Sequence, residues 1–369
     1  MGKLKINKVE TFRGAVPLTK PFKTALRTVE KAESIYVKIS CDNGIVGWGE
    51  APPTHVITGD SLSSIEYAIN GIFSPFLAGK TLLNYEEIFQ ELSSILVGNS
   101  SAKAAVDMAL YDCLSQHCSL PLYQFLGGFR NEIETDYTVS VNSPGEMAED
   151  ASEYIKKGFT VLKIKVGIGD IETDVLRIRE IRSRIGFGIK LRLDANQGWK
   201  PKEAVKAIRK MEDSGLQIEL VEQPVKAVDI EGLKQVTDSV ETPIMADESV
   251  FTAKQAFEVL KTRSADFINI KLMKSGGIYQ AQKINQLAEA CGVECMVGSM
   301  IETRLGISAA AHFAASKKNI TRFDLDAPLM LASDNIEGGI EYKGRMITFP
   351  DSTGLGIKNV HAEGGVFHV

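Results

Sequence analysis

Apolar and polar positions change their rhythm along the chain, and the most regular pattern begins near residue 135. Eight short apolar runs follow one another there, each with the length and alternation of a β-strand. They are TDYTVSV, TVLKIKV, IKLRLDAN, IELVEQP, PIMADES, FINIKLM, VECMVGS and ITRFDLD. Helical patterns separate them, and the polar residues that close successive runs recur at roughly 24–29-residue intervals. This alternation predicts an α/β barrel with its active site at the carboxyl ends of the strands.

A doubly wound open sheet is the competing α/β architecture. No G-x-G-x-x-G sequence opens any of the helical stretches, so nothing supports the nucleotide-binding form of that fold.

The chain before the barrel pattern is of mixed type. Residues 5–18 and 34–51 have strand patterns, and the second is broken by a hairpin-turn sequence, Asp42-Asn43-Gly44. Three helical patterns follow at 60–77, 84–98 and 101–118. We therefore predict an N-terminal α+β domain over residues 1–125 and a barrel over 126–334, and we expect residues 335–369 to return to the first domain.

Composition and charge narrow the class of protein. The chain has 369 residues, 44% of them apolar and 24% charged, with a net charge of −5. This acidic balance favours neither nucleic acid nor an anionic membrane surface. No apolar run approaches the roughly 20 residues of a membrane helix, and the first residues lack the apolar core of a signal peptide. Five cysteines without a framework spacing read as reduced thiols, so we expect a cytoplasmic protein.

One cysteine group could be read as a zinc site. Cys113, His117 and Cys118 lie close together in the sequence AAVDMALYDCLSQHC. That stretch has the pattern of a helix, and we interpret these residues as helix packing instead of metal ligands.

Acidic residues close three successive barrel strands. Asp194, Glu222 and Asp247 would converge at one edge of the barrel, where three carboxylates cannot all stay ionised without a compensating charge. Each acid alone could be a helix cap or a loop charge, but their shared register favours a site. All-oxygen ligands suit a hard cation, so we predict Mg²⁺, with Mn²⁺ also possible, and not zinc.

Lysines accompany these acids. Lys163 and Lys165 alternate in LKIKVG and should both face the barrel interior, and Lys271 closes the strand four units later. Surface lysines at strand ends are the alternative, but strands two and six of an eight-strand barrel lie opposite each other. Two opposed bases beside a divalent ion could remove and return the weakly acidic proton next to a carboxylate, through an enediolate.

The motifs LKIKVG, LRLDANQGW, LVEQP, MADESV and NIKLMKSGG together resemble the muconate-lactonizing subgroup of the enolase superfamily. The resemblance spans essentially the whole chain and implies a modified (β/α)7β barrel under an N-terminal α+β capping domain. It implies metal binding by Asp194, Glu222 and Asp247, and acid/base roles for Lys165 and Lys271. The mandelate racemase branch of the superfamily fits poorly, because no histidine stands at CMVGSM, the seventh strand.

The last strand carries the residues that would distinguish reactions within this subgroup. In TRFDLDAPL, Asp324 and Asp326 form a D-x-D that is similar to the signature of dipeptide epimerases, where it holds the substrate ammonium. Two carboxylates on one strand face need a cation, which an ammonium group supplies. Cycloisomerisation, succinylbenzoate synthesis and N-acylamino acid racemisation share the barrel chemistry and remain alternatives, and a non-catalytic binding barrel is the remote one.

The resemblance also implies two capping loops and further substrate contacts. Arg27, in the loop 17–34, resembles the arginine that binds the glutamate side chain in relatives acting on L-Ala-D/L-Glu; the second loop covers 47–60. The remaining contacts implied are Thr138, Lys163, Ser299 and Ile301. We therefore expect a Mg²⁺-dependent dipeptide epimerase, most specifically for L-Ala-D/L-Glu, that salvages cell-wall peptides and forms a homo-oligomer.

Overall fold

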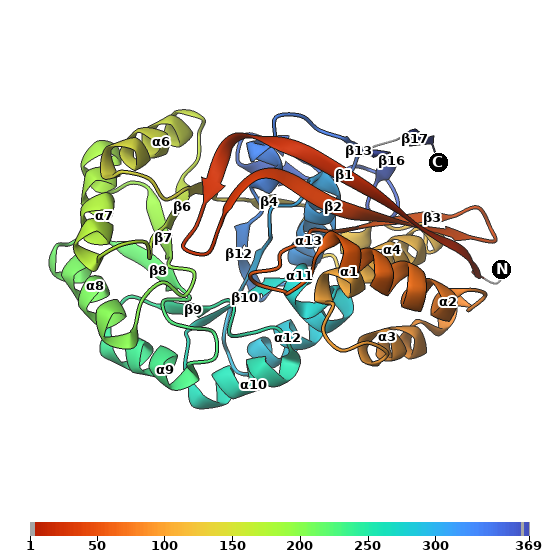
Figure 1. Cartoon of the computed structure of the whole chain (residues 1–369), viewed down its shortest axis with the longest axis horizontal. Helices are drawn as coiled ribbons and strands as arrows, with labels where there is room; N and C mark the ends of the chain where they lie inside the picture. The colour runs from red at the N-terminus through yellow and green to blue at the C-terminus, as the bar shows by residue number, and fades with distance from the viewer. Residues whose placement is uncertain (1–3, 363–364, 369) are drawn as a thin grey trace.

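Eight parallel strands form the central barrel of the computed structural model, which describes residues 4–362 and 365–368 (Figure 1). They pair in sequence order from β5 to β12. The strands are β5 (Tyr137–Val139), β6 (Val161–Lys165), β7 (Lys190–Asp194), β8 (Ile218–Glu222), β9 (Ile244–Ala246), β10 (Phe267–Lys271), β11 (Cys295–Gly298) and β12 (Ile320–Asp324). Each of the eight predicted runs contains one of them, which confirms the barrel.

Helices follow the first seven barrel strands and cover the outside of the barrel. They are α6 (Pro144–Lys156), α7 (Ile171–Ile185), α8 (Pro201–Asp213), α9 (Ile230–Ser239), α10 (Ala253–Thr262), α11 (Leu272–Ser275), α12 (Ile278–Ala290) and α13 (Arg304–Ser316). Polar residues begin several of these helices: Ser143, Asp170 and Thr252 each accept a hydrogen bond from a backbone N–H in the first turn. In the described residues after β12, the one helical segment is the short turn η3 (Ala327–Met330), so the fold is the expected (β/α)7β form.

The barrel closes between β12 and β5, its last and first strands. There the backbone N–H of Asp136 donates to the carbonyl of Phe323 at 3.2 Å. Side chains complete the seam, because Thr138 N donates to Asp326 Oδ2 at 2.6 Å and Leu325 N donates to Thr135 Oγ1 at 2.9 Å. The D-x-D segment is therefore held at this seam.

An apolar layer lies beneath the strand ends inside the barrel. Leu220, Met245 and Met296 are fully buried and pack together with Phe267, apart from the main core. Leu220 precedes Glu222 by two residues and Met245 precedes Asp247 by two, so each pair shares the inward face of its strand. The polar side chains at the strand ends thus lie directly above this apolar layer.

The N-terminal part contains an antiparallel sheet of β1 (Ile6–Lys23), β2 (Thr28–Cys41) and β3 (Val46–Ala51). Its helical segments are α1 (Leu62–Tyr67), the π-helical η1 (Ala68–Phe73), α2 (Ser74–Leu77), η2 (Leu82–Asn84), α3 (Tyr85–Ser94), α4 (Ser100–His117) and α5 (Leu122–Phe125). The segment 17–34, expected as a loop, is largely strand: β1 and β2 form a long hairpin whose turn, residues 24–27, reaches the barrel (Figure 1).

The C-terminal segment contributes short strands to two small sheets. In the first, β14 (Glu341–Lys343) pairs with β15 (Met346–Thr348), which pairs with β4 (Glu132–Glu134); the second contains β13 (Ile336–Gly338), β16 (Ile357–Ala362) and β17 (Gly365–His368). Asn335 Nδ2 donates to Tyr36 Oη at 2.7 Å, and Leu355 N donates to Asp112 Oδ1 at 2.8 Å. The division at residues 125 and 334 stays a prediction.

Two further features concern the helices and the thiols. In the described part of the chain, no helix combines the length and the apolar character needed to cross a membrane. All five cysteines are free thiols, and Cys113 is buried in α4, where its thiol contacts the carbonyl of Ile39. Cys113, His117 and Cys118 are not among the metal-capable side-chain groups found in the described residues.

Candidate active site

Three acidic side chains meet at the carboxyl ends of neighbouring strands. Asp194 ends β7, Glu222 ends β8 and Asp247 directly follows β9. All three are fully buried, and one oxygen of each lies within 4.8 Å of the others. The structure therefore brings together the three residues that we predicted as metal ligands.

The donor set of this acidic group suits a divalent ion. Every donor is a carboxylate oxygen, as Mg²⁺ prefers. Glu222 Oε2 and Asp247 Oδ1 are buried and form ion pairs with the ammonium nitrogens of Lys163 and Lys274, at 2.8 and 2.6 Å. Glu222 is oriented by Asn269, whose Nδ2 donates to Oε1 at 2.8 Å.

Lys163 lies at the centre of the site. Its Nζ is 3.0 Å from Asp194 Oδ2, 2.8 Å from Glu222 Oε2 and 2.7 Å from Asp324 Oδ2. The side chain is almost completely buried, so its positive charge would be strongly destabilising without these carboxylate partners. Burial alone would lower its pKa, but the surrounding carboxylates outweigh burial and raise the pKa well above its usual range.

The two predicted catalytic lysines contact different acids. Lys165 Nζ donates to Asp194 Oδ2 at 2.6 Å and to Asn196 Oδ1 at 3.2 Å. Lys271 Nζ donates to Asp247 Oδ2 at 2.7 Å. Their strands, β6 and β10, are four apart in the eight-strand order, so the lysines come from opposite sides of the barrel.

The pKa values of the acids diverge according to their partners. Burial and the charge on Asp194 raise the pKa of Glu222 to about 8. Burial also opposes ionisation of Asp194 and Asp247, but the lysines outweigh it and hold both pKa values below their usual range. For Lys271, burial favours the neutral amine, yet Asp247 outweighs burial and raises the pKa.

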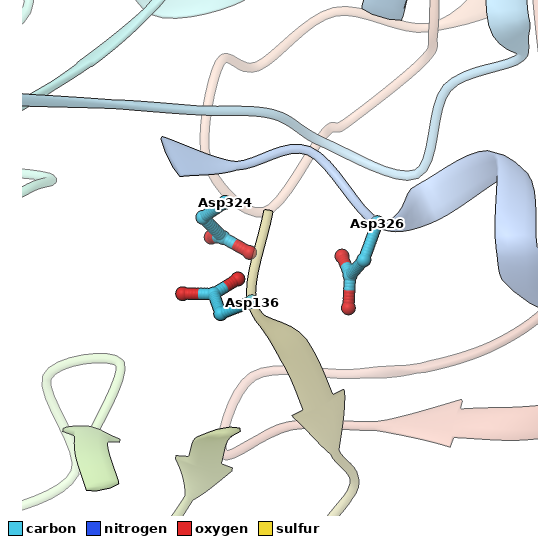
Figure 2. A group of neighbouring side chains, drawn as sticks. All are labelled: Asp136, Asp324 and Asp326. Atoms are coloured by element: carbon cyan, nitrogen blue, oxygen red, sulfur yellow. The ribbon is translucent and has the colours of Figure 1, made fainter. Parts of the chain in front are cut away.

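The D-x-D pair lies on the other side of Lys163. Asp324 ends β12 and pairs with that lysine, whereas Asp326 accepts its hydrogen bond from the backbone N–H of Thr138. Burial and the charge on Asp324 raise the pKa of Asp326 to about 7. Figure 2 shows both carboxylates beside a third, that of Asp136.

A cavity of about 550 Å³, including its mouth, opens over these groups. Its lining contains every residue that we predicted to contact substrate, together with both predicted catalytic lysines: Arg27, Thr138, Lys163, Lys165, Lys271, Ser299, Ile301, Asp324 and Asp326. The hairpin turn supplies Arg27 and, with Phe22, forms part of the cavity wall. The predicted metal ligands are not in the lining and lie deeper.

Several residues of the site were missed from the sequence. Asn196 links two parts of it, since its Nδ2 donates to Glu248 Oε1 at 3.2 Å while its Oδ1 accepts from Lys165. Lys274, which we had not assigned to the site, is buried and donates to the carbonyls of Asp247, Val250 and Asn269. Both residues lie within three positions of a predicted site residue, and this proximity is the feature of the sequence that could have identified them.

The fold and the strand-end chemistry define a barrel enzyme of the enolase superfamily. Residues 6–127 match the family model of the mandelate racemase/muconate lactonizing enzyme N-terminal domain, and residues 146–361 match the enolase C-terminal domain-like model. The chain belongs to the mandelate racemase/muconate lactonizing enzyme family, and it is an isomerase.

Relatives of assigned activity are similar to this protein over almost the whole chain. The chain is 69% identical over 354 residues to the L-Ala-D/L-Glu epimerase of Bacillus subtilis (strain 168), covering 96% of this chain and 97% of that protein. The substrate-liganded structure of the Bacillus subtilis enzyme matches with a TM-score of 0.95 and 67% identity, covering 98% and 99% of the two chains. A dipeptide epimerase from Enterococcus faecalis V583, solved with Mg and L-Leu-L-Tyr, matches with a TM-score of 0.93 and 48% identity, covering 96% and 99%.

Proposed function

We propose that this protein is a Mg²⁺-dependent dipeptide epimerase that inverts the α-carbon of the C-terminal residue, with L-Ala-D/L-Glu as its substrate. The observation that carries the proposal is the joint lining of one cavity by two lysines, an arginine and the D-x-D carboxylates. The 69% identity to an L-Ala-D/L-Glu epimerase supports the same substrate. Salvage of cell-wall peptides is the role that this reaction would serve.

Asp194, Glu222 and Asp247 would hold the metal. Mg²⁺ bound by them, or Mn²⁺, would supply the positive charge that offsets the second negative charge of the substrate carboxylate as the α-proton leaves. The all-carboxylate donor set and the complete burial of the three acids support this assignment.

Lys165 and Lys271 would move the proton. An epimerase needs one group to remove the α-proton from one face and another to return a proton on the opposite face. These lysines project from strands on opposite sides of the barrel, and both line the cavity. Asp247 orients Lys271, while Asn196 and Asp194 orient Lys165.

The ends of the dipeptide would be recognised by charge. Asp324 and Asp326 would bind the free ammonium group, and Arg27 the side-chain carboxylate of the second residue. Thr138, Lys163, Ser299 and Ile301 would surround the peptide between them. N-acylamino acid racemisation, the main alternative, uses a substrate without the ammonium group and leaves the D-x-D pair without a cation.

Incubation with L-Ala-L-Glu and Mg²⁺ in D₂O tests the proposal. The expected result is formation of L-Ala-D-Glu with one deuterium at the α-carbon of glutamate. Lys165→Ala and Lys271→Ala should each abolish epimerisation, while exchange of the proton on one face survives. Full turnover by either variant would exclude the two-lysine mechanism, and preference for an N-acyl amino acid would favour the racemase.

A further inference from the structure

Asp136 is a buried carboxylate beside the D-x-D pair, and the proposed function gives it no role. It directly precedes β5 and is 1% exposed. Since it stands two residues before Thr138, its side chain faces the same barrel interior. One oxygen from each of Asp136, Asp324 and Asp326 lies within 4.8 Å of the others, and Figure 2 shows the Asp136 carboxylate next to that of Asp324.

The two oxygens of Asp136 have different surroundings. Oδ2 accepts a hydrogen bond from Arg192 Nη1 at 2.9 Å. Oδ1 is equally inaccessible to solvent but has no hydrogen-bond partner, which is costly for a buried carboxylate. One oxygen of this carboxylate is therefore unsatisfied, within a group of three buried acids.

The nearby cations are shared with other acids. Arg192 Nε also pairs with Glu219 Oε2, at 2.7 Å, so its charge is divided between two carboxylates. Lys163 is divided among three, only one of which, Asp324, belongs to this group. Burial and the charge on Asp324 raise the pKa of Asp136 well above its usual range. The three carboxylates therefore hold full negative charge only when a further cation lies beside them.

We propose that Asp136 is a positioning residue of the ammonium subsite, which acts from behind Asp324 to strengthen binding of substrates with a primary ammonium group. The inference rests on the proposed function and deepens it, because it adds a third acid to the D-x-D pair. Asp136 is not part of the cavity lining, so it acts through its field and through the orientation of Asp324. A substrate with a neutral group at the same place gains nothing from it.

Two substrates that differ only in this group provide the test. We would compare L-Ala-D-Glu with L-lactoyl-D-Glu, in which a hydroxyl replaces the ammonium, in wild-type protein and in Asp136→Asn. KM for the dipeptide should rise at least tenfold in the variant, because the Coulomb energy of one charge a few ångströms away exceeds about 1.4 kcal/mol at an effective dielectric constant near 20. KM for the lactoyl compound and kcat for both should change less than about twofold.

Glu219→Gln is the matched control. It removes the other carboxylate that pairs with Arg192, on a side chain that is 18% exposed and that does not belong to the group of three acids. It should leave the ratio of the two KM values unchanged. An equal loss on both substrates in Asp136→Asn, or a dipeptide KM within twofold of wild type, would overturn the inference.

Two further measurements distinguish a folding failure of the variant from a failure of the proposed function. If Asp136→Asn does not fold, the double variant Asp136→Asn/Arg192→Gln removes both partners of the buried pair. The KM ratio should then change in the same direction but by less, because the positive charge of Arg192 is lost together with the negative charge of Asp136. Wild-type protein that does not prefer the dipeptide would refute the ammonium subsite itself. A wild-type preference that survives in the variant would refute only the role of Asp136.

Discussion

Lys163 connects the acids assigned to the metal with the acid assigned to the ammonium group. The alternation of LKIKVG predicts that its side chain points into the barrel, and the structure agrees. The pattern could not predict that one ammonium nitrogen would contact acids from β7, β8 and β12, because those contacts depend on how strands far apart in sequence are tilted. For the same reason Asp136 was missed, although it stands at the alternate position before Thr138.

The raised pKa of Asp326 gives a pH dependence to the ammonium subsite. Below about pH 7 this carboxyl group takes up a proton and loses its attraction for a cation. KM for L-Ala-D-Glu should therefore rise about fivefold between pH 7 and pH 6, because only the ionised form binds well. Initial rates over this range measure it, with L-lactoyl-D-Glu as the neutral control. A pH-independent KM in wild type, or an unchanged profile in Asp326→Asn, would contradict the assignment.

At the scale of elements, alternation was a sufficient guide to the barrel strands but not to the hairpin over the barrel. All eight strands were predicted, since their buried faces produce a regular pattern. The end of β1 and the start of β2, next to the turn, are largely exposed to solvent. The pairing of the two strands is irregular between Pro17 and Phe22. The resemblance implied a loop over residues 17–34, and without a buried face PLTKPFKTALRT shows no alternation that would have contradicted it.

This hairpin delivers Arg27 to the cavity, so its turn should control the choice of second residue. Lys23 N donates to Ser140 Oγ at 3.3 Å and Val141 N donates to the carbonyl of Lys23 at 3.2 Å, which fixes the turn to the barrel. Arg27→Met should raise KM for L-Ala-D-Glu about 10–100-fold, because a carboxylate loses charged hydrogen bonds, and should leave KM for L-Ala-L-Leu unchanged.

Steady-state kinetics on the two dipeptides measures this difference. Lys23→Met is the control, since its ammonium lies on the same turn but donates to Asn142 Oδ1 at 3.2 Å. It should affect neither substrate. An equal loss on both dipeptides in Arg27→Met would mean that the arginine only supports the hairpin.

At the scale of the whole molecule, buried carboxylates of the N-terminal part join it to the barrel. Glu50 accepts hydrogen bonds from Thr303 N and Gly306 N at the start of α13, at 2.9 and 2.8 Å. Asp107 accepts from the backbone of Ile278 and Tyr279 at the start of α12. These acids were not assigned from the sequence, because a carboxylate that caps a distant helix has no local signature.

Metal binding should be visible in the stability of the whole chain, independently of turnover. An ion that binds only the folded protein stabilises it by about 2.7 kcal/mol when its free concentration is a hundredfold above Kd. Mg²⁺ should therefore raise the Tm of wild type, and Asp194→Asn should lose this rise. Asp112→Asn is the control: it removes a buried charge that binds Trp48 N and Leu355 N, far from the strand ends. It should lower Tm and keep the full response to Mg²⁺. A rise that persists in Asp194→Asn would place the ion elsewhere.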